Sequence, residues 1–233
     1  MYYVNFRKIK EKTKMEVDHI FICTQYGAPE AEVLKAFGLT EGSSNKHPGQ
    51  GTENRRFFFK NLFIELLWLE NQEEAMSNLT SPTMLYDRLT SKNVNISPFG
   101  ICFRPKNSED KTVKFPSWNY KPIYLPNNFE VKVAENTLLS EPMWFFLSFA
   151  SRPDNAPQEK RQPLIHSNGL SEVTSIEVTI PNSNKNFTLP DQQQLGMLKI
   201  NDGTEHILEI TFDNGKQNLI HDFRPTLPII FKY

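Results

Sequence analysis

Residues 54–69 have the sequence NRRFFFKNLFIELLWL, and this stretch decides the fold. Two runs of aromatic and branched side chains, 54–59 and 62–69, are typical of β-strands. Only Lys60 and Asn61 separate them, and a two-residue connection that contains Asn is typical of a β-hairpin. The sequence therefore predicts two antiparallel strands joined by a tight turn.

The position of the turn predicts which side chains lie opposite each other in this hairpin. With a two-residue loop, Phe58 faces Phe63 and Arg56 faces Glu65. Glu65 alternates with Phe63 and Leu67, so its carboxylate lies on an apolar face and must be paired, metal-bound or protonated. A cross-strand ion pair with Arg56 would satisfy both groups without a metal, and metal binding by Glu65 is the alternative.

A third strand is predicted before the hairpin, at residues 17–23 (VDHIFIC). Side chains alternate between the two faces of a strand, which places Val17, His19 and Phe21 on one face and Asp18 on the other. His19 then points into an enclosed and partly apolar environment. There it serves either as a hydrogen-bonded core residue or as a ligand.

A short helix and a polar loop are predicted between the strand and the hairpin. Pro29 favours a helix start and Gly38 a helix end. The loop 42–52 contains HPGQG, whose glycines allow tight backbone turns. His47 or Gln50 could offer a polar contact to a ligand from this loop, and an ordinary surface loop is the alternative.

The rest of the chain is predicted to be rich in short strands. Sixteen Pro against ten Gly favour extended segments and few long helices. One further helix is predicted at 83–91, opened by Ser81 and Pro82. The predicted strands are 96–103, 123–125, 129–133, 143–150, 173–180, 196–200 and 206–212.

Composition excludes several classes of protein. The 233 residues are 38% hydrophobic and 23% charged, which excludes a disordered chain. The net charge of −1 excludes a globally basic nucleic-acid binder. No apolar run approaches the length of a membrane-spanning helix. We therefore expect neither nucleic acid nor a membrane as a partner.

The cysteines and the amino terminus favour a cytoplasmic protein. Cys23 and Cys102 both lie in apolar runs, as expected of buried thiols in a reducing compartment rather than of a disulfide framework. The basic leader, residues 1–14, is not followed by the apolar core of a secretory signal. We expect the leader to be dispensable for folding, with an added edge strand at 2–6 as the alternative.

Several motifs together resemble the glyoxalase-like branch of the vicinal oxygen chelate superfamily, which includes glyoxalases, bleomycin-resistance proteins and dioxygenases. The resemblance rests on DHI at 18–20, HPGQGT at 47–52, NRRFFF at 54–59 and FIELLW at 63–68, and more loosely on GICFRP at 100–105.

The resemblance implies an α+β fold. Its paired βαβββ modules have curled mixed β-sheets around a cavity. In this chain the first module would span residues 15–95. The second, residues 96–233, would be diverged and strand-rich, with a C-terminal tail.

Metal-using members of the superfamily imply a candidate metal site. There, a divalent ion is bound by one residue on the first strand and one on the last strand of each module, which correspond to His19 and Glu65 in module one. These are good ligands for Zn, Fe, Mn or Ni. In module two, Gly100 would match His19 and cannot ligate, and the alternative strands offer Ser175 and Glu209. A four-residue site is therefore not visible in the sequence.

Two functions follow from the resemblance, both with a small organic molecule in the cavity. In a metal-assisted lyase, isomerase or dioxygenase, Glu65 moves protons beside the metal and His19, His47, Gln50 and Arg56 contact the ligand. In a metal-free module similar to the drug-resistance proteins, the same cavity binds or sequesters the ligand. A third reading is a cavity filled by the protein's own Phe and Trp side chains. A second copy of the chain, as a homodimer, is the other expected partner.

Overall fold

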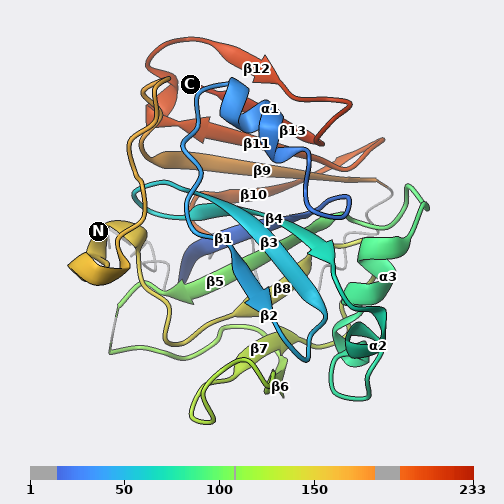
Figure 1. The fold of residues 1–233 in the computed structure, drawn as a ribbon. Coiled ribbons are helices and arrows are strands. Elements are labelled where there is room, and N and C mark those ends of the chain that lie inside the picture. The colour runs from blue at the N-terminus through green and yellow to red at the C-terminus, as the bar shows by residue number, and fades with distance from the viewer. Residues whose placement is uncertain (1–14, 108, 182–194) are drawn as a thin grey trace, which may run out of the picture.

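Two β-sheets packed on each other form the protein in the computed structural model, which describes residues 15–107, 109–181 and 195–233 (Figure 1). The predicted leader, 1–14, lies outside these ranges, so its dispensability stays a prediction. No helix in the described part of the chain is long and apolar enough to cross a membrane.

The larger sheet consists of two four-stranded halves that meet at its centre. In sheet order, its strands are β2 (Asn45–His47), β3 (Thr52–Phe58), β4 (Phe63–Leu69), β1 (Met15–Cys23), β5 (Phe99–Pro105), β8 (Met143–Phe146), β7 (Val131–Ala134) and β6 (Ser117–Tyr120). The central strands β1 and β5 are antiparallel, and each has a parallel neighbour, β4 and β8 respectively. Each half thus repeats the arrangement of the other, and the predicted α+β fold with paired modules is confirmed.

The hairpin predicted from residues 54–69 is present with the predicted register. Strands β3 and β4 pair Arg56 with Glu65 and Phe58 with Phe63. The backbone N–H of Phe59 donates to the carbonyl of Leu62 at 2.8 Å and closes the turn. Adjacent side chains of this hairpin therefore face opposite sides of the large sheet.

Short helices connect the strands. They are α1 (Ala31–Ala36), α2 (Gln72–Ala75), α3 (Leu85–Thr90) and the 3₁₀ turns at Ser81–Thr83, Pro153–Asn155, Gln158–Lys160 and Asp213–Gly215. The prediction of one helix from Thr83 is corrected at its start, because Met84 has a φ of 57° and separates the 3₁₀ turn from α3. Left-handed backbone at this residue ends one turn and allows α3 to begin in a new direction.

The smaller sheet is formed by the carboxy-terminal part of the chain. In sheet order it contains β10 (Leu198–Gly203), β9 (Val173–Pro181), β11 (Ile207–Phe212), β13 (Ile229–Lys232) and β12 (Ile220–Asp222). The strands predicted near 173–180, 196–200 and 206–212 are confirmed. Strands β2, β6, β12 and β13 were not predicted, and the strand predicted at 123–125 is absent from the described residues.

The hydrophobic core lies between the two sheets. The large sheet contributes the outward side chains of its strands, including Phe57, Phe59 and Trp144, and the small sheet contributes Phe212 and Phe231. Ring centroids of Phe59 and Phe212 are 4.7 Å apart, and those of Phe212 and Phe231 are 4.8 Å apart. Because this layer covers one face of the large sheet, the side chains of the other face are free to line a cavity.

Candidate functional site

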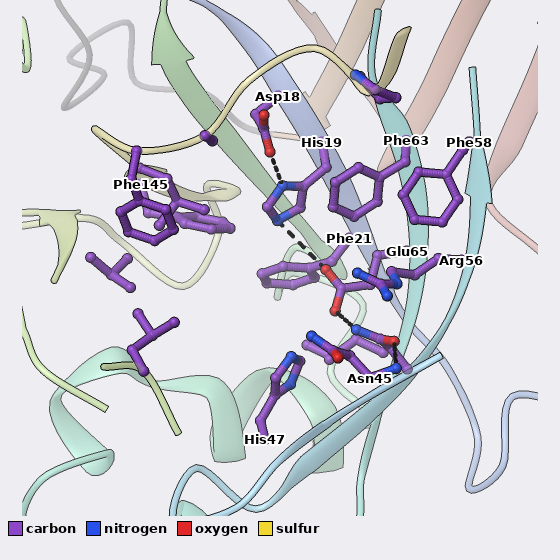
Figure 2. Close-up of a pocket in the computed structure, with 18 of the residues that line it drawn as sticks. Asp18, His19, Phe21, Asn45, His47, Arg56, Phe58, Phe63, Glu65 and Phe145 are labelled. Atoms are coloured by element: carbon purple, nitrogen blue, oxygen red, sulfur yellow. Dashed lines mark hydrogen bonds and ion pairs between the residues drawn. The ribbon is translucent and has the colours of Figure 1, made fainter. Parts of the chain in front are cut away.

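A cavity of about 450 Å³ lies against the inner face of the large sheet. Its wall is largely aromatic and aliphatic, with a small group of polar side chains, as in most small-molecule sites. The polar lining residues are Asp18, His19, Asn45, His47, Gln50, Asn54, Arg56, Glu65, Ser151, Arg152, Lys160 and Gln162. The apolar ones include Phe21, Phe58, Phe63, Leu67, Tyr120, Tyr124, Met143 and Phe145 (Figure 2). The reading in which the protein's own aromatic side chains fill the cavity is therefore wrong.

A β-bulge in β1 turns two adjacent side chains toward this cavity. The pairing of β1 with β5 shifts register between Val17 and His19. As a result Asp18 and His19 both line the cavity, and Val17 packs in the core between the sheets. The predicted alternation is thus corrected at this point, because the extra residue of a bulge reverses the facing of the side chains that follow it.

Asp18 orients the imidazole of His19. Its Oδ2 lies 2.7 Å from Nδ1 of His19, and its Oδ1 accepts a hydrogen bond from Nη1 of Arg104 at 3.0 Å. Burial alone would raise the pKa of Asp18, but the hydrogen bond from His19 and the charges of His19 and Arg104 hold that pKa below its ordinary value. An ionised Asp18 can only accept, so Nδ1 carries the proton of this hydrogen bond whether or not the ring is charged. In the uncharged form of the ring, the lone pair therefore lies on Nε2.

Nε2 of His19 faces Glu65. The distance from Nε2 to Oε2 of Glu65 is 3.6 Å, and the other carboxylate oxygen accepts a hydrogen bond from Nδ2 of Asn54 (Figure 2). Both residues are buried. Asp18, His19 and Glu65 therefore form a continuous line of titratable groups that ends at the cavity.

Arg56 does not form the predicted ion pair with Glu65, although the two residues are paired in the sheet. Its Nε donates to the carbonyl of Ser43 at 2.8 Å, and its Nη2 donates to Oγ of Ser43 at 2.9 Å. The guanidinium also lies over the rings of Phe58 and Phe63. The prediction is corrected because the guanidinium lies over these rings, bonded to the Ser43 loop, and Glu65 is bonded to Asn54 instead.

The loop residues His47 and Gln50 also line the cavity. Both are bonded to Oγ1 of Thr52, at 2.9 Å from Nδ1 of His47 and 2.8 Å from Nε2 of Gln50. Burial lowers the pKa of His47, which favours a neutral ring beside Tyr124. The alternative of a plain surface loop is therefore wrong for these two side chains.

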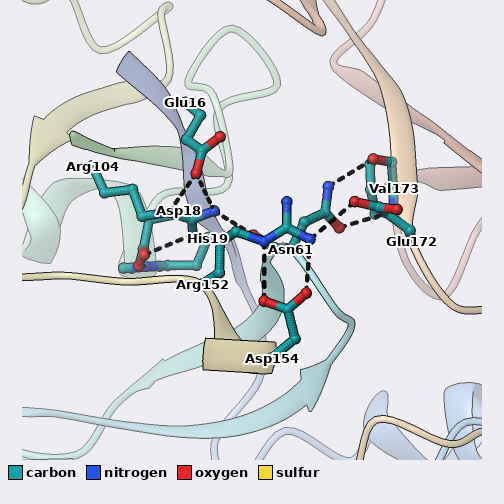
Figure 3. A network of polar contacts seen from close by, with 9 residues as sticks. All are labelled: Glu16, Asp18, His19, Asn61, Arg104, Arg152, Asp154, Glu172 and Val173. Atoms are coloured by element: carbon teal, nitrogen blue, oxygen red, sulfur yellow. Dashed lines mark hydrogen bonds and ion pairs between the residues drawn. The ribbon is translucent and has the colours of Figure 1, made fainter. Parts of the chain in front are cut away.

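Arg104 links the site to the second sheet (Figure 3). It is buried, and besides Asp18 it bonds to Oε1 of Glu16 and to the carbonyl of Asn61. The side chain of Asn61 bonds in turn to both backbone groups of Val173 in β9. Neither Arg104 nor Asp18 was predicted to belong to the site, and the useful signal was the arginine inside the otherwise apolar run 99–105.

The second half of the sheet carries no ligating side chains at the positions that match His19 and Glu65. In the central pair, Phe21 lies opposite Gly100 and His19 opposite Cys102, which makes Gly100 the counterpart of His19. Glu65 lies beside Phe21 in β4, and Phe145 lies beside Cys102 in β8 at the equivalent place.

Aromatic rings occupy the place where the second half of the sheet would hold metal ligands, which we call the missing half-site. A Cβ built on Gly100 would lie 2.0 Å from the ring of Phe21. The ring of Phe145 meets His19 edge-on, with centroids 5.4 Å apart. The alternative strands do not supply ligands either, because Ser175 and Glu209 belong to the small sheet, where Glu209 pairs with Lys232.

The side chains present do not fit a divalent metal ion. Asp18, His19 and Cys102 have ligand atoms within 4.8 Å of one another. However, both Asp18 oxygens are occupied by His19 and Arg104, and burial raises the pKa of the Cys102 thiol well above its ordinary value. His19 and Glu65 alone supply two donors, fewer than a stable site needs. Within the described residues, no other cluster of three such donors is present.

A substitution at Gly100 tests the packing of the missing half-site. Gly100→Ala is expected to destabilise the fold by about 1–3 kcal/mol, because the new methyl group overlaps the Phe21 ring. Phe21→Leu in the same chain should recover part of this loss, measured by urea unfolding. Additive effects of the two substitutions would contradict a direct clash.

Solved structures are similar to this chain at low sequence identity. A hypothetical protein from Staphylococcus aureus has 12% identity and a TM-score of 0.50, over 93% of this chain and 98% of that one. A hypothetical protein from Bacillus halodurans C-125 has 17% identity and a TM-score of 0.40, over 59% and 96%. A xylose isomerase-like TIM barrel/4-hydroxyphenylpyruvate dioxygenase fusion protein has 12% identity and a TM-score of 0.46, over 86% and 37%.

A family model covers most of the chain. No curated protein matches the sequence. The model of the glyoxalase-like domain, in contrast, matches residues 17–185, which include the large sheet except the first two residues of β1, and all the polar residues of the cavity. Together with the paired-module sheet, this match shows that the chain belongs to the glyoxalase-like domain family of the vicinal oxygen chelate superfamily.

Proposed function

We propose that this glyoxalase-like protein binds a small organic molecule in its cavity and moves a proton on it with His19, without a bound metal. The observation that carries the proposal is the line Asp18–His19–Glu65, which ends in a cavity of about 450 Å³. Cavities of this size bury most of a small ligand's surface.

The chemistry follows from the orientation of His19. Asp18 holds the Nδ1 proton, so Nε2 presents its lone pair to the cavity. When Nε2 takes a proton from a ligand C–H or O–H group, Asp18 and Glu65 stabilise the positive ring from both sides. Glu65 lies close enough to accept or return that proton.

Neutral donors and aromatic rings would hold the ligand around this base. Burial raises the pKa values of Tyr120 and Tyr124, so both hydroxyl groups remain donors. Gln50, placed by Thr52, offers an amide beside Tyr124. Such a wall favours a ligand that is flat and apolar, with few polar groups.

Proton exchange into a bound ligand tests the proposal. Compounds that raise the melting temperature of EDTA-treated protein are incubated with it in D₂O, and loss of ligand C–H signals is followed by NMR. We expect exchange with the unsubstituted protein and a rate lower by about 10²–10⁴-fold with His19→Gln. His221→Gln, on the exposed strand β12, is the control and should exchange normally.

Two outcomes would contradict the proposal. Ligands that bind without any exchange would favour the binding or sequestering module. Exchange that EDTA abolishes and one of Zn, Fe, Mn or Ni restores, with stoichiometric metal lost in His19→Gln, would favour the metal-assisted enzyme.

A further inference from the structure

Arg56 is a cation in the cavity wall that forms no hydrogen bond or ion pair with an acidic side chain of the described residues, although the charge of Glu65, its partner in the sheet, acts on it. Its hydrogen bonds go to neutral groups, the carbonyls of Ser43 and Ser44 and the hydroxyl of Ser43. Within the described residues, Nη1 has no hydrogen-bond partner and the guanidinium forms no ion pair. The adjacent Arg55, on the outer face, bonds instead to Glu32 and Glu41.

The guanidinium of Arg56 is held in place by two aromatic rings. Its central carbon lies 5.1 Å from the ring centroid of Phe58 and 5.7 Å from that of Phe63. Arg56 is only partly exposed, and burial lowers its pKa, as expected for a cation with restricted access to water. A fixed and poorly solvated guanidinium binds a carboxylate more strongly than a mobile surface side chain does.

The other charged groups around the cavity are already compensated, with one exception at its rim. Asp18 is bonded to Arg104 and His19, and Arg152, which also lines the cavity, is paired with Asp154 and Glu172. Glu65 faces His19. The exception is Lys160, an exposed lining residue that forms no ion pair within the described part of the chain. Arg56 and Lys160 are therefore the lining cations that form no ion pair within the described residues.

The ring of Phe63 separates Arg56 from His19. It stacks on His19, with centroids 4.4 Å apart and planes at 14°, and lies beneath the guanidinium of Arg56 (Figure 2). Arg56 and His19 are therefore both neighbours of Phe63 in the wall of one cavity. A flat ligand bound against this wall would have both the guanidinium and the imidazole beside it.

On the basis of the proposed cavity function, we infer that the ligand is a small organic carboxylate with a flat apolar body, whose carboxylate group binds Arg56. Phe58 and Phe63 position the guanidinium, and Lys160 attracts the anion at the rim. The carbon or hydroxyl group beside the carboxylate then lies toward His19. A neutral ligand of the same shape would leave Arg56 without a counter-ion and bind less tightly.

Matched acids and amides test this inference. Benzoate, phenylacetate and cinnamate are each titrated calorimetrically beside their primary amides, which have the same shape and no charge. We expect measurable binding of at least one acid and about tenfold or weaker binding of its amide. Arg56→Gln should remove this preference, and Arg55→Gln, the matched control on the outer face, should retain it.

The outcomes separate the carboxylate inference from the cavity function. If amides bind as tightly as acids, or Arg56→Gln retains the preference for the acid, the carboxylate inference is wrong and the cavity function stands. If none of the six compounds binds, the carboxylate inference is overturned, and exchange with other ligands decides the cavity function. Should Arg56→Gln fail to fold, Arg56→Lys replaces it. Lysine keeps the charge without the planar two-point geometry, so an affinity between those of the acid and the amide is expected.

Discussion

Arg104→Met is expected to lower the free energy of unfolding by about 3–5 kcal/mol. The substitution leaves Asp18 and Glu16 without their shared cation and removes the bond to the carbonyl of Asn61. Asp18 is buried, so water cannot replace the lost partner. Urea unfolding at neutral pH measures the loss. Arg55→Met is the control, and its loss should be much smaller because solvent screens ion pairs at the surface.

The loss caused by Arg104→Met should depend on pH. The pKa of Asp18 lies below its ordinary value of 3.8 in the folded protein, so its ionised form stabilises the fold above pH 3.8. This contribution disappears as the pH falls through the folded-state pKa. The difference between the two proteins should therefore narrow below pH 3.8. In an Asp18→Asn background, Arg104→Met should cost less, and an undiminished cost would contradict the pairing.

Phe212→Ala is expected to destabilise the protein by about 3–5 kcal/mol, because it opens a cavity between the two sheets. Phe212 is completely buried and contacts Phe59 of the large sheet and Phe231 of the small one. Phe149→Ala is the matched control. Phe149 is only partly buried and lines the ligand cavity, where no closed core surrounds it.

The comparison of these two variants tests whether the small sheet is part of the folding unit. Thermal and urea unfolding of Phe212→Ala should each show one transition, shifted as a whole. A separate early transition, with the large sheet unaffected, would contradict a shared core. Ligand binding should change in Phe149→Ala and stay unchanged in Phe212→Ala under conditions in which both are folded.

Local patterns in the sequence were sufficient to predict much of the large sheet. The hairpin register follows from the two-residue turn at Lys60 and Asn61, since a loop one residue longer or shorter would reverse the facing of Glu65 relative to Arg56. Gly100 as the counterpart of His19 also agrees with the pairing of the central strands. The first prediction depends on residues that are close together in the sequence. The second depends on the second module repeating the strand order of the first.

The remaining features depend on contacts between distant parts of the chain. Val173 bonds to the side chain of Asn61, more than a hundred residues earlier, and no local pattern predicts such a pairing. The facing of Asp18 was predicted incorrectly because strict alternation does not allow for a bulge. The partner of Arg56 was also predicted incorrectly, since register shows which residues are adjacent but not which of several neighbours a side chain bonds to.

Because Phe21 and Phe145 occupy one of the two half-sites, the two halves of the sheet have different roles. All the proposed reactive groups come from the first half, whereas β7 and β8 contribute unreactive side chains that line the cavity. Substitutions at wall residues of the second half such as Val131 in β7 can therefore reshape the cavity while Asp18, His19 and Glu65 stay unchanged. A duplicated fold that has lost its symmetric centre in this way can diverge toward new ligands while it keeps a single chemistry, because shape and reactivity are encoded in separate stretches of the chain.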